Sequence, residues 1–153
     1  MARPIDEFEV AWSALSGSDS SIGWRCIAVS PSGSCPVMAA RRFPNNDEAI
    51  LVGFTSDIAP PKDSLPNSIG FEVSREDPLG DSKTWIALSR KDSGSPEMFS
   101  EMVCDITGAM DSFSGDEEAV LRTMISRIRA WQEFMRNMMR GLSPEAELGL
   151  FGE

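Results

Sequence analysis

The sequence predicts an α+β domain, with an antiparallel or mixed sheet of about five strands within residues 23–90. Strand-like apolar runs, separated by turn-forming residues, occupy the first part of the chain. After Ser95 the apolar residues recur at helical spacing instead. Strands followed by helices favour an α+β fold over an alternating, doubly wound one. We expect one helix before the sheet and two long helices after it, packed on one of its faces.

The first predicted elements are a helix over residues 4–15 and a β-hairpin. Pro4 suits the first turn of a helix, and the apolar residues after it recur at helical spacing. These residues are Ile5, Phe8, Trp12 and Leu15. The hairpin has strand-like runs at 24–30 and 35–43, and the turn-forming residues P-S-G-S lie between them.

Three further strands complete the predicted sheet. Residues 49–54 form a continuous apolar run, which is typical of a strand buried on both faces and therefore predicts a central position. Residues 57–68 contain three prolines among polar residues and predict a long surface loop. Strands are expected again at 70–74 and 84–89, because a segment rich in turn formers separates these two runs.

Two long helices are predicted after residue 95. Ser95, Pro96 and Glu97 are typical of a helix N-terminus. The expected buried face of this helix consists of Phe99, Met102, Val103, Ile106, Met110 and Phe113. Ser114 and Glu117 match a capping box, which predicts the start of the last helix. Its expected buried face consists of Val120, Leu121, Met124, Ile125, Ile128, Trp131, Met135 and Met138.

The composition restricts the classes of function. The net charge is −10, so the chain repels phosphate backbones, and a protein partner is favoured over direct contact with DNA. The sequence contains no histidine and no C-x-x-C motif, which excludes histidine chemistry and leaves few zinc ligands. The three cysteines, Cys26, Cys35 and Cys104, are expected to be free and buried. The chain has neither a signal peptide nor an apolar run of roughly 20 residues, so we expect a cytoplasmic protein without a membrane partner.

The nearest match to a metal-nuclease triplet is Asp81, Ser82 and Lys83. Metal-dependent cleavage of a phosphodiester needs carboxylates and a lysine that project from a rigid element. Asp81 and Lys83 instead lie in a turn-forming segment before a strand. We therefore interpret them as solvated turn residues.

A basic stripe is expected on the last helix, because Arg122, Arg129 and Arg136 recur every seven residues. The stripe suits contact with phosphate or with an acidic partner. The structural alternative is that these arginines complement the helix dipole and pair with acids such as Glu133. We favour the structural alternative.

Seven of the nine methionines lie in the helical half of the chain. Methionine side chains fill irregular cores and also line adaptable interaction grooves, and we favour the core interpretation for most of them. Met139 is the exception, because it lies at the edge of the predicted apolar face and close to the C-terminal segment. We therefore include Met139 among the candidate interaction residues.

The last segment, residues 142–153, reads L-S-P-E-A-E-L-G-L-F-G-E. Ser143, Pro144 and Glu145 predict a helix start. Leu148, Leu150 and Phe151 are apolar residues that require a cover, so they are candidate interaction residues. The segment resembles one that leads into the nuclease core in a bacterial family of PD-(D/E)XK nucleases associated with restriction and phage defence.

The resemblance implies that residues 1–141 form a single non-catalytic accessory domain, and that residues 142–153 begin a helix leading into a nuclease core. It implies Mg²⁺-dependent DNA cleavage by the parent protein, whereas this chain by itself has no catalytic residue and no cofactor. Glu153 resembles a glutamate near the metal in that superfamily, so its metal role is latent and requires the core. The expected partner is the protein's own nuclease domain or another defence protein, and DNA is reached only through the parent.

An alternative function is a stand-alone interaction subunit that docks through its C-terminal apolar segment. Docking of this kind would cover Leu148 and Phe151 without nuclease chemistry. The two functions differ in whether the reading frame continues past Glu153 into the catalytic motif.

Overall fold

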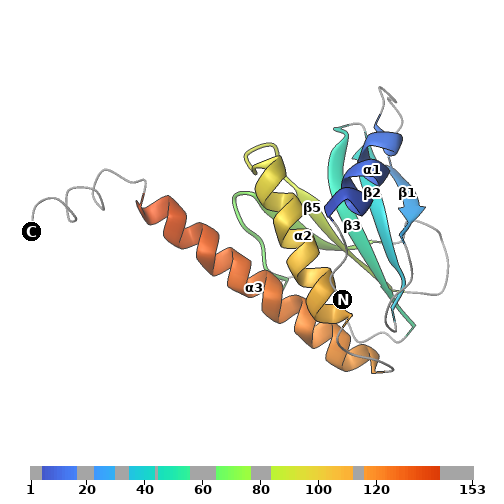
Figure 1. Ribbon diagram of the computed structural model, residues 1–153. Coiled ribbons are helices and arrows are strands. Elements are labelled where there is room, and N and C mark those ends of the chain that lie inside the picture. Colours follow the sequence, from blue (N-terminus) through green and yellow to red (C-terminus); the bar gives the residue numbers. More distant parts are fainter. Residues whose placement is uncertain are drawn as a thin grey trace, which may run out of the picture.

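The computed structural model describes residues 5–16, 23–29, 35–43, 45–55, 65–76, 84–111 and 116–141. Helix α1 (Ile5–Leu15) precedes five strands, and helices α2 (Pro96–Met110) and α3 (Glu117–Gly141) follow them. The three helices lie on one side of the sheet, and the C-terminal part of α3 extends past the body of the molecule (Figure 1). The predicted α+β class is confirmed.

The five strands form one sheet in which every neighbouring pair is antiparallel. The strands are β1 (Gly23–Ala28), β2 (Val37–Phe43), β3 (Asp47–Phe54), β4 (Phe71–Glu76) and β5 (Thr84–Arg90). They are arranged in the order β1-β2-β3-β5-β4. The apolar run at 49–54 lies in β3, which is the middle strand and is buried on both faces. Its predicted central position is confirmed.

The main hydrophobic core lies between the sheet and the three helices. From the sheet it includes Ile50, Val52 and Ile86, and α1 contributes Phe8 and Trp12. The indole Nε1 of Trp12 donates a hydrogen bond of 2.9 Å to a backbone carbonyl of β3, which fixes α1 on the sheet. The predicted faces of α1 and α2 point inward where the structure describes them. The Ile5 side chain and Phe113, which are also predicted on these faces, lie outside the described residues.

A second, smaller core lies on the opposite face of the sheet. Ala40, Ala49 and Ala87 are fully buried there, together with Leu51 and Trp85. Gly53 lies opposite Trp85 in the sheet register. A Cβ at Gly53 would lie 2.9 Å from the Trp85 ring, so glycine is required for the ring to lie against the strand.

The sheet curls until its edges approach each other on this second face. Strands β2 and β4 are three positions apart, which would be about 14 Å in a flat sheet. The Arg42 guanidinium nevertheless pairs with Glu72 at 3.2 Å and with Glu76 at 3.4 Å. Trp24 of the opposite edge strand donates from Nε1 to Glu76 at 3.4 Å, and Arg42 lies over the Trp24 ring. These contacts link strands that are not neighbours in the sheet.

The start of α3 differs from the prediction. Ser114, the expected cap, lies outside the described residues, and the helix begins at Glu117. Asp116 caps the helix, because its carboxylate accepts hydrogen bonds from the backbone N–H groups of Glu118 and Ala119 at 3.1 and 3.4 Å. An aspartate directly before the helix performs the capping role assigned to serine.

The buried face of α3 ends earlier than predicted. The first half of the helix is anchored by Val120, Leu121, Met124 and Ile128, which are all buried. Ile125, Trp131 and Met135 are partly buried against the core. Met138 is 40% exposed, so its predicted burial is wrong. The reason is that the last turns of α3 extend beyond the sheet (Figure 1).

The predicted surface loop at 57–68 is described only from Leu65 onward. Leu65 and Pro66 are buried, and Leu65 belongs to the main core, so the surface prediction is wrong for these two residues. The Asn67 side chain accepts a hydrogen bond of 2.7 Å from the backbone N–H of Val73. The end of the loop is thus held against β4. In the described part of the chain, no helix combines the length and the apolar character needed to cross a membrane.

Candidate interaction site

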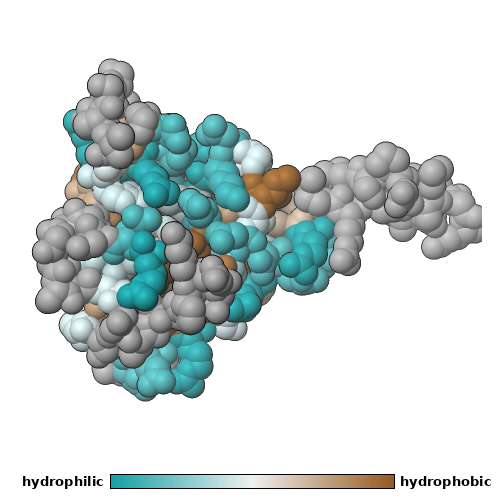
Figure 2. Space-filling model, turned by 180° about the vertical axis from the view of Figure 1, so that it is seen from behind, coloured by the Kyte–Doolittle hydropathy of each residue, from teal (hydrophilic) through white to brown (hydrophobic). Residues whose placement is uncertain are grey.

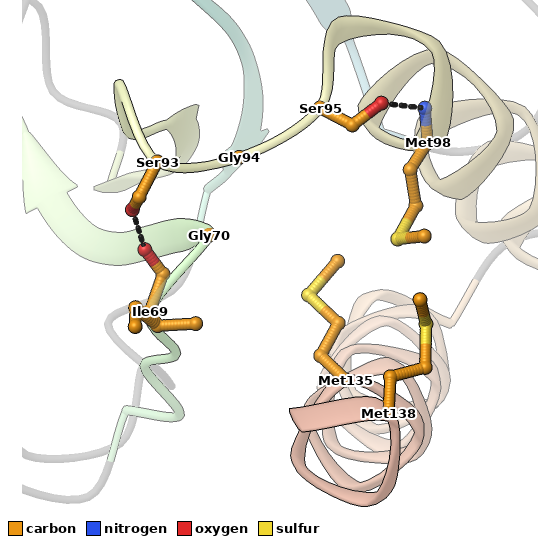
Figure 3. A pocket seen from close by; sticks show the side chains of 8 residues that line it. All are labelled: Ile69, Gly70, Ser93, Gly94, Ser95, Met98, Met135 and Met138. Atoms are coloured by element: carbon orange, nitrogen blue, oxygen red, sulfur yellow. Dashed lines mark hydrogen bonds between the residues drawn. The ribbon is translucent and has the colours of Figure 1, made fainter. Parts of the chain in front are cut away.

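An apolar groove lies between α3 and the segments that precede β4 and α2. Its hollow has a volume of about 170 Å³. Met98 comes from the first turn of α2, Met135 and Met138 come from α3, and their side chains surround the hollow (Figure 3). Ile69 and Gly70 line the opposite side, together with Ser93, Gly94 and Ser95. We call this feature the methionine groove.

The wall of the groove is a close backbone contact between Gly70 and Gly94. A Cβ at Gly94 would lie 2.3 Å from the Gly70 carbonyl oxygen, so only glycine allows this approach. The Ser93 hydroxyl donates to the Ile69 carbonyl, and the Lys91 N–H donates to the Gly70 carbonyl at 3.0 Å. Two segments that are distant in sequence thus form one rigid wall.

The first turn of α2 forms another part of the groove. Ser95 caps this helix, because its hydroxyl accepts a hydrogen bond of 3.2 Å from the backbone N–H of Met98 (Figure 3). The cap predicted at Ser95 is confirmed. Because the cap orders the first turn, it also fixes the position from which the Met98 side chain enters the groove.

The groove is apolar and open to solvent. Ile69 is 56% exposed and Met138 is 40% exposed, so large apolar side chains are accessible at the groove. Viewed from the back of the molecule, apolar surface lies near the C-terminal part of α3 (Figure 2). Methionine side chains are flexible and polarisable, so a groove that they line adapts to the shape of an apolar ligand.

Polar groups border the groove on the side of Ser68. The Lys91 ammonium donates to the Ser68 carbonyl at 2.8 Å. A second hollow beside the groove is lined by Gln132 and Arg136 of α3, and Gln132 donates to the Asn67 carbonyl at 2.6 Å. Two cationic side chains therefore lie next to the groove on this side: Arg136 in the second hollow and Lys91 at Ser68.

The three arginines of the predicted stripe, Arg122, Arg129 and Arg136, are exposed on α3. Arg136 pairs with Glu133 at 3.0 Å, and both side chains are more than half exposed. This pair is the one that the structural alternative predicted. A pair so exposed adds little stability, so Arg136 can reach a nearby acidic group at little cost.

Carboxylates in the described sheet are held by arginines. Glu48 pairs with Arg90 at 2.8 Å and with Arg41 at 3.8 Å, and these three side chains are mostly buried. Glu72 and Glu76 share Arg42, as described above. Within the described ranges, no three His, Cys, Asp or Glu residues are arranged to hold a metal ion. The oxygens of Glu48, Glu72 and Glu76 contact guanidinium groups, so these three carboxylates serve as ion-pair partners within the sheet.

Several predicted site residues lie outside the described part of the chain. These are Leu148, Leu150, Phe151 and Glu153, together with Asp81 and Lys83 of the candidate triplet. Met139 lies within α3, but its side chain is not among those described.

The cysteines are free, as predicted, but only Cys35 is fully buried. Cys26 and Cys104 are partly buried at the edges of the two cores. Burial raises the pKa of Cys26 and the pKa of Cys35 to about 11, and the charge of Glu117 adds to the effect at Cys35. Burial also raises the pKa of Cys104. All three thiols are therefore protonated at neutral pH.

These pKa values predict the pH dependence of thiol alkylation and of stability. In the folded protein, alkylation of the partly buried Cys26 by iodoacetamide should keep accelerating up to pH about 11, whereas Cys26 of the unfolded chain should level off near pH 9.0. Between pH 9.0 and about 11, the folded state retains thiol protons of Cys26 and Cys35 that the unfolded state releases. This contribution to stability is therefore complete below pH 9.0 and is lost as the pH rises towards about 11. A plateau near pH 9 in the folded protein would contradict the assignment.

The methionines divide between core and groove. Met102, Met110 and Met124 are buried core residues, so the predicted core role is right for them. Met135 and Met138 line the groove instead. Sequence reasoning missed Ile69 and the contact between Gly70 and Gly94. The sequence does show a serine and a glycine in each of two turns, Ser68 with Gly70 and Ser93 with Gly94. Nothing in the sequence indicates that these two turns contact each other.

The structure is an α+β domain with an apolar groove beside its last helix. A sequence model of the DUF4420 family, described as "Putative PD-(D/E)XK family member", matches residues 8–153. The chain belongs to this family, so the predicted resemblance to PD-(D/E)XK family members is confirmed. No curated protein and no solved structure matches the chain significantly.

Proposed function

We propose that this chain is an N-terminal, non-catalytic domain of a PD-(D/E)XK-family protein that cleaves DNA with Mg²⁺ in bacterial restriction or phage defence. The observation that carries the proposal is the family match over residues 8–153. Catalysis requires an aspartate and an (Asp/Glu)-x-Lys motif, which we place in a nuclease core after residue 153. Mg²⁺ belongs to that core, and Glu153 would join the metal site only when the core is present.

The arrangement of charges supports an accessory role. Arginine side chains hold Glu48, Glu72 and Glu76, so these acids stabilise the sheet rather than bind a metal ion. The net charge of −10 also disfavours a DNA-binding surface on this domain. Its task would be to cover or position the nuclease core or to connect it to another defence protein in the cytoplasm. DNA would be contacted by the parent protein alone.

A plasmid-cleavage assay with Mg²⁺ or Mn²⁺ tests this proposal. The 153-residue chain is compared with the product of the uninterrupted reading frame. We expect cleavage by the longer product and none by the chain alone, because the metal-binding carboxylates and the lysine are supplied by the core. Cleavage by the chain alone would overturn the proposal. Replacement of the core aspartate by asparagine in the longer product is the control for a contaminating nuclease.

The alternative is a stand-alone interaction subunit that docks through its C-terminal apolar segment. The position of the methionine groove favours this alternative, because apolar side chains are exposed beside the end of α3. A reading frame that ends at Glu153, together with the absence of cleavage, would make it the better account. Binding of a defence protein that is lost in Leu148→Ser and Phe151→Ser would then support it.

A further inference from the structure

We infer that the methionine groove is a docking site for residues 148–151 of the same chain, with the Phe151 ring in the hollow and Leu148 beside it. The inference concerns contacts within this chain and does not depend on whether the parent protein cleaves DNA. Four features favour residues 148–151 as the occupant. They are the size of the hollow, the length of the segment that follows α3, the opposite charges of the segment and of side chains next to the groove, and the spacing of the segment's apolar residues.

The hollow has the size of one aromatic side chain. Its volume is about 170 Å³. An apolar cavity of about 150 Å³ accepts benzene, which has the same ring as phenylalanine. Phe151 is the aromatic residue of segment 142–153. The three methionines that surround the hollow also suit a ring, since thioether sulfur makes favourable contacts with aromatic edges.

The segment is long enough to reach the groove. Helix α3 ends at Gly141, and Met138 lies within the last turn of the helix. The ten residues after Gly141 span about 15 Å as a helix and up to about 33 Å when extended, so Phe151 is within reach in either form. Met135, on the far side of the groove, lies about 9 Å back along the helix axis. A reversal of the chain after Gly141 therefore brings Phe151 to the hollow with length to spare.

The charges of the segment and of side chains next to the groove are complementary. Residues 142–153 contain Glu145, Glu147 and Glu153 but no basic residue. Lys91 and Arg136 lie next to the groove on the side of Ser68, and the exposed pair of Arg136 with Glu133 leaves it able to contact a further acid. Contacts between an acidic segment and these cationic side chains fix its orientation, although exposed pairs add little affinity.

The spacing of the apolar residues supplies a matched control. Leu148 and Phe151 are three residues apart and share one face of a helix, the element that Pro144 and Glu145 predict. Leu150 lies two residues from Leu148 and faces elsewhere. The groove should therefore respond to a change at Phe151 and not to the same type of change at Leu150.

Methionine-methyl NMR of the full 153-residue chain tests the inference. An aromatic ring in the groove shifts the ε-methyl signals of Met98, Met135 and Met138. Phe151→Ala should move these three signals towards their solvent-exposed positions. Leu150→Ala should leave them in place. The signals of the buried Met102 and Met124 report on the fold and should remain unchanged in both variants.

Each result has a defined meaning. A response of the three groove methyls to Phe151→Ala, independent of protein concentration, supports docking within one chain. The inference is overturned if these methyls do not respond to Phe151→Ala, or if they respond equally to Leu150→Ala. If the ring shifts disappear on dilution of the unmodified chain, the occupant is the segment of a second copy, and docking within one chain is excluded.

Discussion

Replacement of Gly94 by alanine should destabilise the domain by about 1–3 kcal/mol, because the new Cβ would lie 2.3 Å from the Gly70 carbonyl oxygen. The clash is with backbone, so no rotation of a side chain relieves it. The segment before α2 would have to move away from β4, and the hydrogen bond from Lys91 N–H to the Gly70 carbonyl would weaken. Urea unfolding, followed by circular dichroism, measures the change in the free energy of unfolding.

Gly70→Ala is the matched control for this prediction. Its Cβ would lie 3.4 Å from Gly94 Cα and 3.5 Å from the sulfur of Met135, which are ordinary contacts. Its effect should therefore be much smaller. Equal destabilisation by the two substitutions would show that the loss of glycine flexibility, rather than the backbone clash, determines the result.

Glu48→Ala should destabilise the domain by about 2–3 kcal/mol, because it removes a mostly buried carboxylate shared by two arginines. The Glu48 side chain is 14% exposed, and those of Arg41 and Arg90 are 14% and 18% exposed. Arg90 also donates to the Gly94 carbonyl at 2.9 Å, so Glu48 orders the wall of the methionine groove indirectly. Urea unfolding at neutral pH provides the measurement.

Glu133→Ala serves as the control for an exposed ion pair. Glu133 pairs with Arg136 at 3.0 Å, but their side chains are 56% and 52% exposed. Its removal should change the free energy of unfolding by less than about 1 kcal/mol. A result for Glu48→Ala as small as that for Glu133→Ala would contradict the structural importance of the Glu48 pairs.

The sequence predicts the elements of this fold well, because local patterns determine them. The apolar run at 49–54 predicts a strand buried on both faces, and β3 has this position. The helical spacing of Phe99, Met102 and Ile106 predicts the buried face of α2. Each of these predictions requires only the periodicity of side chains along one element.

The sequence does not predict contacts that depend on how far an element extends or on how the sheet curves. Met138 continues the apolar spacing of α3, yet it is exposed because the helix extends beyond the sheet. Arg42 reaches Glu72 and Glu76 because the sheet curls, and no local pattern encodes that curvature. The methionine groove depends on Gly70 and Gly94 meeting across the fold, so it was not predicted.

We propose that this domain contributes structure and docking to a PD-(D/E)XK-family protein, whereas residues outside it bind the metal. The most direct test is a titration of the 153-residue chain with Mn²⁺, followed by electron paramagnetic resonance of the free ion. We predict only weak, non-saturating association, as expected for a protein with a net charge of −10. A saturable site that binds one Mn²⁺ per chain and is displaced by Mg²⁺ would contradict the claim and would place the metal centre within these residues.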